Sequence, residues 1–147
     1  MTNLDFLLTI SYWKVAILMM VIFIFIDMLW LGFIASNLYT KQLGYLANLK
    51  NSNITFNLPV GLLAQAIIAF GLSLVVALMY KSGGNLSESI LVSALIGFVI
   101  YATYDLTNLS FIKDWPWQIT LIDIIWGTFQ GTLAGAYGYW LLTKLVG

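Results

Sequence analysis

Long apolar runs constrain this chain more than any other feature of its sequence. Four segments, about residues 12–35, 58–80, 87–111 and 117–145, are built almost entirely from apolar side chains. A helix of about 20 apolar residues crosses the hydrocarbon core of a bilayer. In lipid, the backbone polar groups of a spanning segment must be satisfied within the structure, which a helix achieves. We therefore predict an all-α integral membrane four-helix bundle, with residues 1–147 forming one membrane domain.

Composition agrees with this class and excludes several kinds of chemistry. Only 8% of the 147 residues are charged, whereas soluble domains carry about 25%. The chain has no cysteine and no histidine, which excludes disulfides, Cys/His zinc sites and haem held by histidine or thiolate. All six cations are lysines and the net charge is zero, so neither a guanidinium phosphate clamp nor a nucleic-acid surface is expected. We predict no cofactor.

The connection between the first two segments is amphipathic. In residues 38–50, Leu38, Tyr45, Leu46 and Leu49 recur at helical spacing. Such a pattern is typical of a short helix that lies in the membrane surface, so we expect an interfacial helix over about 38–50. Gly44 weakens that helix and leaves an irregular loop as the alternative.

Each of the four apolar segments carries one strongly polar side chain in the same half of the expected bilayer. With a rise of 1.5 Å per residue, Asp105 and Asp123 lie roughly 9 Å from the nearer end of their helices, and Asp27 and Gln65 roughly 12–15 Å. Keeping an ionisable residue inside a membrane costs about 3 kcal/mol or more, so such residues usually mark functional sites. We therefore predict a polar layer close to one face of the membrane.

This layer supplies the candidate site residues. Acid–base catalysis needs two titratable groups in different environments, and we expect Asp105 and Asp123 to form that pair, with Asp27 as a third catalytic acid and Asn108 orienting one of them. The ligand-binding candidates are the aromatic and amide side chains nearby: Tyr101, Tyr104, Trp30, Trp126, Gln65 and Gln130. We predict no metal ligand set, although three carboxylates leave a bound Mg²⁺ open.

Small residues mark a helix interface in the last segment. Gly127, Gly131 and Gly135 form G-x-x-x-G-x-x-x-G, which lets helices approach closely in lipid. The pattern does not say whether the neighbouring helix belongs to the same chain or to a second copy. We therefore keep a homodimer through these glycines as an expected assembly.

The motifs of the second half resemble those of a known family. Y-x-x-Y-D-L-T-N-L, followed by K-D-W-P and D-x-x-W-G, is similar to small bacterial four-helix membrane proteins grouped only as a domain of unknown function. The resemblance covers essentially the whole chain, including D-x-x-W-L-G from Asp27. It implies a multi-pass protein of the bacterial cytoplasmic membrane and no particular activity. The matching positions are Tyr104, Asp105, Thr107, Asn108, Lys113, Asp114, Trp115, Pro116, Asp123, Trp126 and Gly127.

Three functions fit these residues. The first is an enzyme or binding protein that acts on a membrane lipid or isoprenoid by acid–base chemistry, which makes membrane lipids the expected partners. The second is a small proton-coupled transporter, because a membrane-embedded acid can exchange a proton for a substrate. The third is a scaffold in which the acids only connect helices. Interhelical hydrogen bonds in membranes average about 0.6 kcal/mol, less than the burial of an acid costs, which favours the first two.

Overall fold

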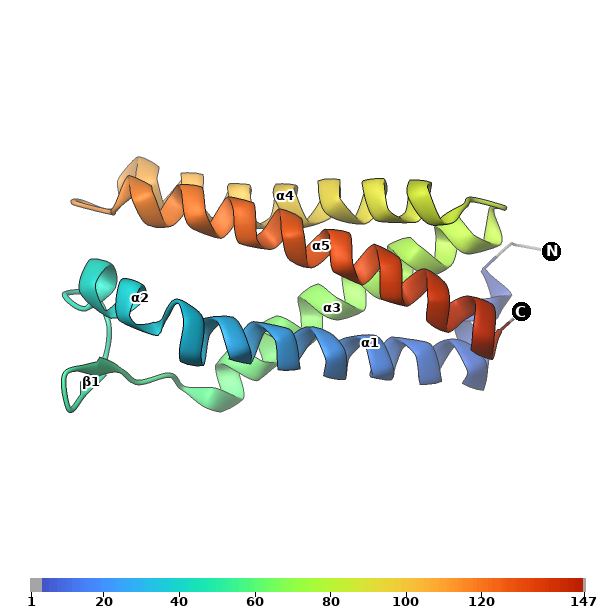
Figure 1. Ribbon diagram of the computed structural model, residues 1–147, viewed down its shortest axis with the longest axis horizontal. Coiled ribbons are helices and arrows are strands. Elements are labelled where there is room, and N and C mark those ends of the chain that lie inside the picture. The colour runs from blue at the N-terminus through green and yellow to red at the C-terminus, as the bar shows by residue number, and fades with distance from the viewer. Residues whose placement is uncertain (1–3, 147) are drawn as a thin grey trace.

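Four long helices make up most of the structure, a computed structural model that describes residues 4–146. The start of α1 (Ile10–Leu29) and the end of α5 (Trp117–Leu145) lie at one end of the molecule, and α2 (Ser36–Leu43) and the turn between α4 (Leu86–Phe111) and α5 lie at the other (Figure 1). We refer to these as the termini end and the α2 end. The elements are η1 (Asp5–Leu8), α1 (Ile10–Leu29), the π-helical turn η2 (Trp30–Ile34), α2 (Ser36–Leu43), β1 (Leu49–Lys50), β2 (Asn53–Ile54), α3 (Leu58–Lys81), α4 (Leu86–Phe111) and α5 (Trp117–Leu145).

The long helices begin where the sequence provides caps. The side chain of Thr9 accepts a hydrogen bond from the backbone of Tyr12, and Asn57 does the same for Val60 at the start of α3. Asn85 and Glu88 form a reciprocal capping box at the start of α4. Such caps satisfy backbone N–H groups that have no partner within the helix. The predicted helix ends therefore agree with the observed ones to within a few residues.

The tightest helix pair is α4 with α5. A side chain at Gly131 would collide with the backbone of Ser93, and one at Gly135 would collide with that of Ser89. Ser89 also donates its hydroxyl to the carbonyl oxygen of Gly135 across 3.1 Å. The glycine face of α5 is thus covered by α4 of the same chain. The homodimer through these glycines would require this contact to open, and it stays a prediction.

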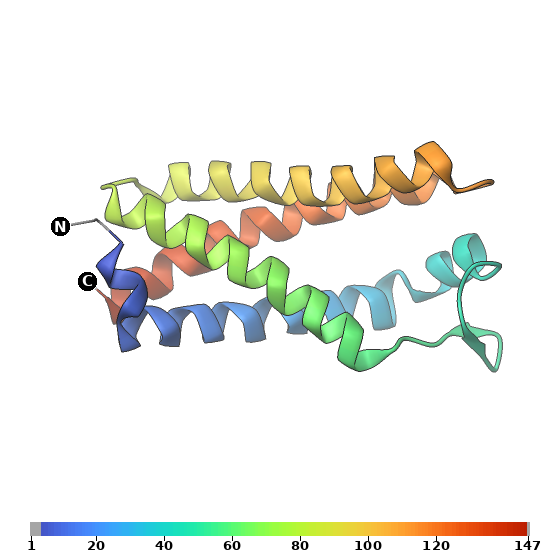
Figure 2. The ribbon, with the colours of Figure 1, turned by 180° about the vertical axis from the view of Figure 1, so that it is seen from behind.

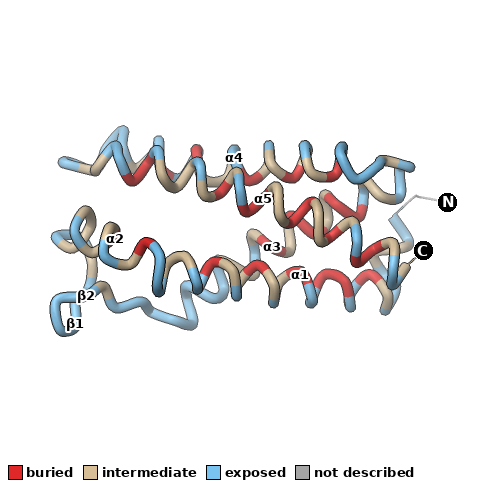
Figure 3. The backbone as a smooth tube through the Cα atoms, viewed as in Figure 1, coloured by how far each residue is buried: buried red, intermediate tan, exposed pale blue. Residues whose placement is uncertain are grey.

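The main hydrophobic core lies in the termini half of the molecule. It joins α1, α3 and α5, and its largest buried side chains include Tyr12, Met19, Phe23, Leu72 and Leu142. The outward side chains of the same helices are apolar and exposed, so only one side of each helix is buried (Figure 3). This distribution is expected when lipid rather than water surrounds the helices.

Toward the α2 end the helices separate. α3 crosses the molecule diagonally and moves away from α4 as it leaves the turn between them (Figure 2). A smaller cluster of buried residues, Ala35, Tyr39 and Ile119, closes this end. The separation leaves space between the helices where the polar residues lie.

The connection between α1 and α3 differs from its prediction. The helix expected over 38–50 spans only Ser36–Leu43, and Leu49–Lys50 instead pairs with Asn53–Ile54 in a small antiparallel hairpin. Asn51 and Ser52 form its turn with positive φ angles of 51° and 64°, which asparagine adopts readily. The apolar spacing of Tyr45, Leu46 and Leu49 was therefore not the signature of one continuous helix.

Three helical segments within residues 4–146 are long and apolar enough to cross a membrane: Ile10–Ile34, Leu58–Lys81 and Leu86–Phe111. The all-α membrane class is thus confirmed. α5 has 29 residues, more than a crossing needs, but its polar and glycine residues lower its hydropathy. Its buried face, which includes Gln130 and Gly131, contacts the other helices rather than lipid.

Candidate functional site

A cavity of about 430 Å³ lies between the helices in the α2 half of the molecule. Its volume falls within the range of small-molecule sites, roughly 300–1,000 Å³. The wall is mostly apolar and aromatic. The polar side chains that reach it come from all four long helices and α2: Asp27, Tyr39, Gln65, Tyr101, Tyr104, Asp105 and Asp123.

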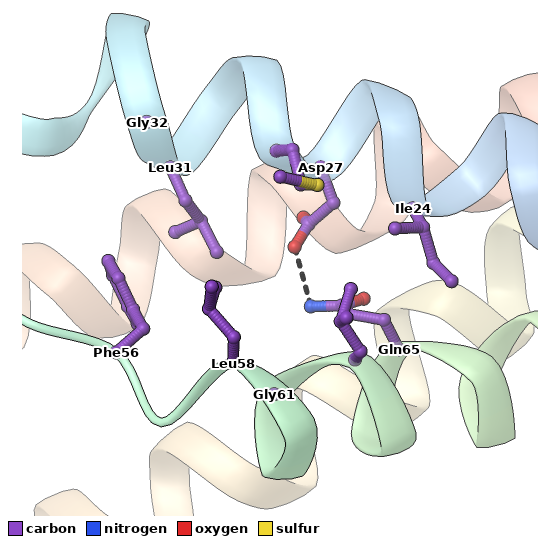
Figure 4. Close-up of a pocket in the computed structure, with 10 residues that line it drawn as sticks. Ile24, Asp27, Leu31, Gly32, Phe56, Leu58, Gly61 and Gln65 are labelled. Carbon is purple, nitrogen blue, oxygen red and sulfur yellow. Dashed lines mark hydrogen bonds between the residues drawn. The ribbon is translucent and has the colours of Figure 1, made fainter.

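Asp27 is the centre of a hydrogen-bond network. Its Oδ1 accepts from the indole N–H of Trp126 at 2.9 Å and from the amide of Gln130 at 3.0 Å. Its Oδ2 accepts from the amide of Gln65 at 2.5 Å (Figure 4). Because these donors come from α3 and α5, the buried carboxylate of α1 connects three helices. Such charge-assisted hydrogen bonds offset the cost of burying the carboxylate.

Asp123 has a different environment. Its Oδ1 accepts a hydrogen bond from the hydroxyl of Tyr39, and that hydroxyl accepts from the indole N–H of Trp30 at 3.4 Å. Burial, followed by the negative charge of Asp123, raises the pKa of Tyr39 well above its ordinary value of 10.0. The phenol therefore stays protonated and remains a donor to Asp123 at neutral pH.

The two tryptophans that follow Asp27 and Asp123 by three residues meet between these acids. The rings of Trp30 and Trp126 stack with centroids 4.3 Å apart and an interplanar angle of 8°. Trp126 donates to the acid of α1, while Trp30 reaches the acid of α5 through Tyr39. The tryptophan of each D-x-x-W motif thus contacts, directly or through Tyr39, the acid of the other motif on the antiparallel helix.

Asp105 has no such partners. The residue is 0% exposed, it lies on the cavity wall, and neither of its carboxyl oxygens has a hydrogen-bond partner within residues 4–146. A buried polar group without a partner is rare and costly. Asp105 is therefore the acid of this cavity that is free to interact with a bound molecule.

The structure brings together most, not all, of the predicted site residues. Asp27, Gln65, Tyr101, Tyr104, Asp105, Asp123 and Trp126 all line the cavity. Trp30 and Gln130 lie behind that wall and contact it through Trp126 and Asp27. Asn108 is half-buried, makes no hydrogen bond with Asp105, and has an amide nitrogen without a partner in the described chain.

Two cavity residues with hydrogen-bonding side chains were not among the predicted site residues. Tyr39 is buried on α2, whereas Tyr45, on the predicted apolar stripe, is 58% exposed. Trp115, named above only as part of the K-D-W-P motif, lines the cavity and donates its indole N–H to Thr120 at 3.1 Å. Nothing in the sequence separates Tyr39 from the other tyrosines, since its role depends on how α2 folds back over Asp123.

The carboxylates do not gather around a common point. Within residues 4–146, no three acidic side chains form a group arranged to hold a metal ion. Asp27 directs both oxygens to protein donors, as described above. The geometry thus offers an apolar cavity with separately placed acids.

These features define an all-α membrane protein with an acid-containing cavity among its helices. The chain belongs to the family described as "Predicted membrane protein (DUF2177)", whose profile matches residues 12–140. This confirms the resemblance seen in the sequence motifs. The comparisons with curated proteins and with solved structures found no match.

Proposed function

We propose that this protein binds a lipid or isoprenoid in the cavity and acts on it by acid–base chemistry. In this proposal all four long helices cross the bacterial cytoplasmic membrane, and α2 lies at its surface. An apolar molecule dissolved in the bilayer reaches such a cavity without passing through water. The mostly apolar wall fits a hydrocarbon chain, and the few polar groups fit one reactive or polar end.

The observation that carries the proposal is the contrast between Asp105 and its surroundings. Its carboxyl group is fully buried, has no partner in the described chain and lies on a cavity wall. A merely structural acid would be expected to have donors, as Asp27 does. An acid left without them supports a role toward a ligand.

The hydrogen bonds also distinguish two roles in the proposed pair. Asp123 accepts a hydrogen bond from Tyr39, which favours its ionised form and suits a base. Asp105 has no donor, which suits the protonated partner that acts as acid. Opposite protonation states in one cavity are what acid–base chemistry on a neutral substrate needs.

Double-bond isomerisation is the simplest reaction for this pair. Asp105 gives its proton to one alkene carbon, and Asp123 removes a proton from the carbon next to the former double bond. The double bond moves by one position, and the two acids exchange protonation states. The faces of Tyr101 and Trp126 stabilise the positive charge that develops between these steps.

The test compares acid variants in the native host. A gene that encodes Asp105→Asn or Asp123→Asn is put in place of the wild-type gene. Asp114→Asn, at an exposed residue of the α4–α5 turn, serves as the matched control. We expect the first two to change the amount of one lipid species by mass spectrometry and the control to leave it unchanged. Unchanged lipids together with a lost proton flux in vesicles would favour transport. No effect on either would favour the scaffold.

A further inference from the structure

A second hollow runs along the outside of the cavity, between α1 and α3. This α1–α3 groove has a volume of about 220 Å³ and is almost entirely apolar. In Figure 4, Leu31 and Phe56 lie toward one end, Ile24 lies toward the other, and the hydrogen-bonded Asp27 and Gln65 lie between them. Both helices that form it are apolar enough to cross a membrane.

The groove adjoins the Asp105 cavity. Asp27, Leu31, Phe56 and Gln65 line both spaces. The Asp27–Gln65 pair therefore stands at their junction, with the groove on one side and Asp105 on the other. The groove and the cavity are therefore neighbours that share these four side chains as a common wall.

Two glycines give the groove its width. Gly32 and Gly61 line it, and a side chain added at either position would meet no atom within 4 Å. This differs from Gly127, Gly131 and Gly135, whose missing side chains make room for α4. A glycine within a helix lowers the stability of that helix by about 0.5–1 kcal/mol relative to alanine. No neighbouring helix uses the space at Gly61, so close packing of helices does not explain this glycine.

We propose that the α1–α3 groove holds one hydrocarbon chain of a membrane lipid and that Gly32 and Gly61 set the room for it. At this position between two membrane-crossing helices, lipid chains are the apolar material that surrounds the protein. The absence of a lysine from the groove wall fits the chain rather than the headgroup. The position of the lipid's polar end, against Asp105, rests on the proposed function.

Photolabelling tests this with the full chain in detergent micelles. The probe is phosphatidylcholine carrying a diazirine within one acyl chain, added in rising amounts. Alkyl diazirines insert preferentially at carboxyl groups. Asp27 lines both spaces, whereas Gly61 lines only the groove and Asp105 only the cavity. The part of the Asp27 labelling that depends on Gly61 therefore reports the groove, and labelling of Asp105 reports the cavity. We expect saturable labelling at Asp27, mapped by mass spectrometry of the peptides.

Gly61→Leu fills the groove, and Gly71→Leu is the matched control. Gly71 lies on the same helix, also has open space around it, and does not line the groove. Leucine favours helix at both sites, so both variants are expected to fold. We expect Gly61→Leu to reduce Asp27 labelling about tenfold. The added side chain keeps about two methylene groups of the lipid chain out of the groove, and the loss of their burial changes the binding equilibrium by about that factor. Gly32→Leu should give the same result if Gly61→Leu fails to fold.

The outcomes separate the groove from the proposed reaction. Equal labelling of Asp27 in Gly61→Leu and Gly71→Leu overturns the groove as a chain site, while the lipid changes expected from Asp105→Asn remain a separate test. Loss of Asp27 labelling only in Gly61→Leu supports the groove. If that loss occurs while Asp105 is never labelled and Asp105→Asn changes no lipid, the groove holds and the proposed reaction fails.

Discussion

Asp27 and Asp105 line the same cavity, yet Asp27 accepts three hydrogen bonds and Asp105 accepts none. Both residues are almost completely buried, at 3% and 0% exposure. Their difference lies only in the donors around them. Asp27 therefore connects α1 with α3 and α5 through its hydrogen bonds, whereas Asp105 forms no hydrogen bond that would connect helices within residues 4–146.

Replacing each acid by leucine should reveal this difference in stability. Asp27→Leu leaves the donors of Gln65, Trp126 and Gln130 without their acceptor, and each buried donor left unsatisfied costs about 1–3 kcal/mol. Asp105→Leu removes no hydrogen bond and should leave stability unchanged or higher. Thermal unfolding in detergent, followed by circular dichroism, measures both.

Asp27→Asn provides the control for that comparison. Its amide oxygen can still accept from Trp126 and Gln130, and Gln65 can rotate to present its own oxygen, which has no partner at present, to the new amide. We expect a smaller loss than for Asp27→Leu. An equally large loss in Asp105→Leu would contradict the contrast between the two acids.

The indole of Trp126 should matter more than that of Trp30. Trp126→Phe keeps an aromatic ring beside Trp30 and loses the 2.9 Å bond to Asp27; a hydrogen bond to a charged group contributes about 1.5–3 kcal/mol. Trp30→Phe loses only a 3.4 Å bond to a hydroxyl, for which about 0.5–1.5 kcal/mol is expected. Chemical or thermal unfolding of the pair should show this order, and the reverse order would argue against the network around Asp27.

The Tyr39 hydroxyl should give stability a dependence on alkaline pH. Its pKa is raised in the folded protein by burial and by Asp123, so the phenol in the unfolded chain loses its proton first. The contribution is fully present below pH 10, about the ordinary pKa of tyrosine, and is lost as pH rises from there toward the folded-state pKa. Tyr39→Phe should flatten this decline above pH 10. Tyr45→Phe, which removes an exposed hydroxyl that donates to the Asp114 carbonyl oxygen, is the matched control.

The glycines of α5 should tolerate substitution far less than Gly71. Gly131→Ala places a methyl group against the backbone of Ser93 on α4, and forced overpacking costs about 1–3 kcal/mol. Gly71→Ala meets open space and should stabilise the helix by about 0.5–1 kcal/mol. Unfolding temperatures test the difference. A neutral Gly131→Ala would mean that α4 and α5 pack less closely than the structure shows.

The sequence by itself determined the membrane class, the approximate ends of the four long helices and the presence of acids in one half of them. Apolar runs, caps and a regular rise per residue are local properties, so they can be predicted without knowing what each helix touches. The D-x-x-W motifs likewise placed Trp30 and Trp126 next to acids. The predicted length of α2 was wrong, because the helix ends at Leu43 with Gly44 as its C-cap, and residues 49–54 form a hairpin instead.

Only the tertiary structure decided what each acid does. The sequence presents Asp27, Asp105 and Asp123 as equivalent acids in apolar helices. Their differences come from residues distant in the chain, such as Gln130 for Asp27 and Tyr39 for Asp123. A hydrogen bond depends on position to within a few tenths of an ångström, and helical periodicity does not fix the distance between helices. The packing of α3 away from α4 therefore left Asp105 without a partner, beside a cavity that no local pattern indicated.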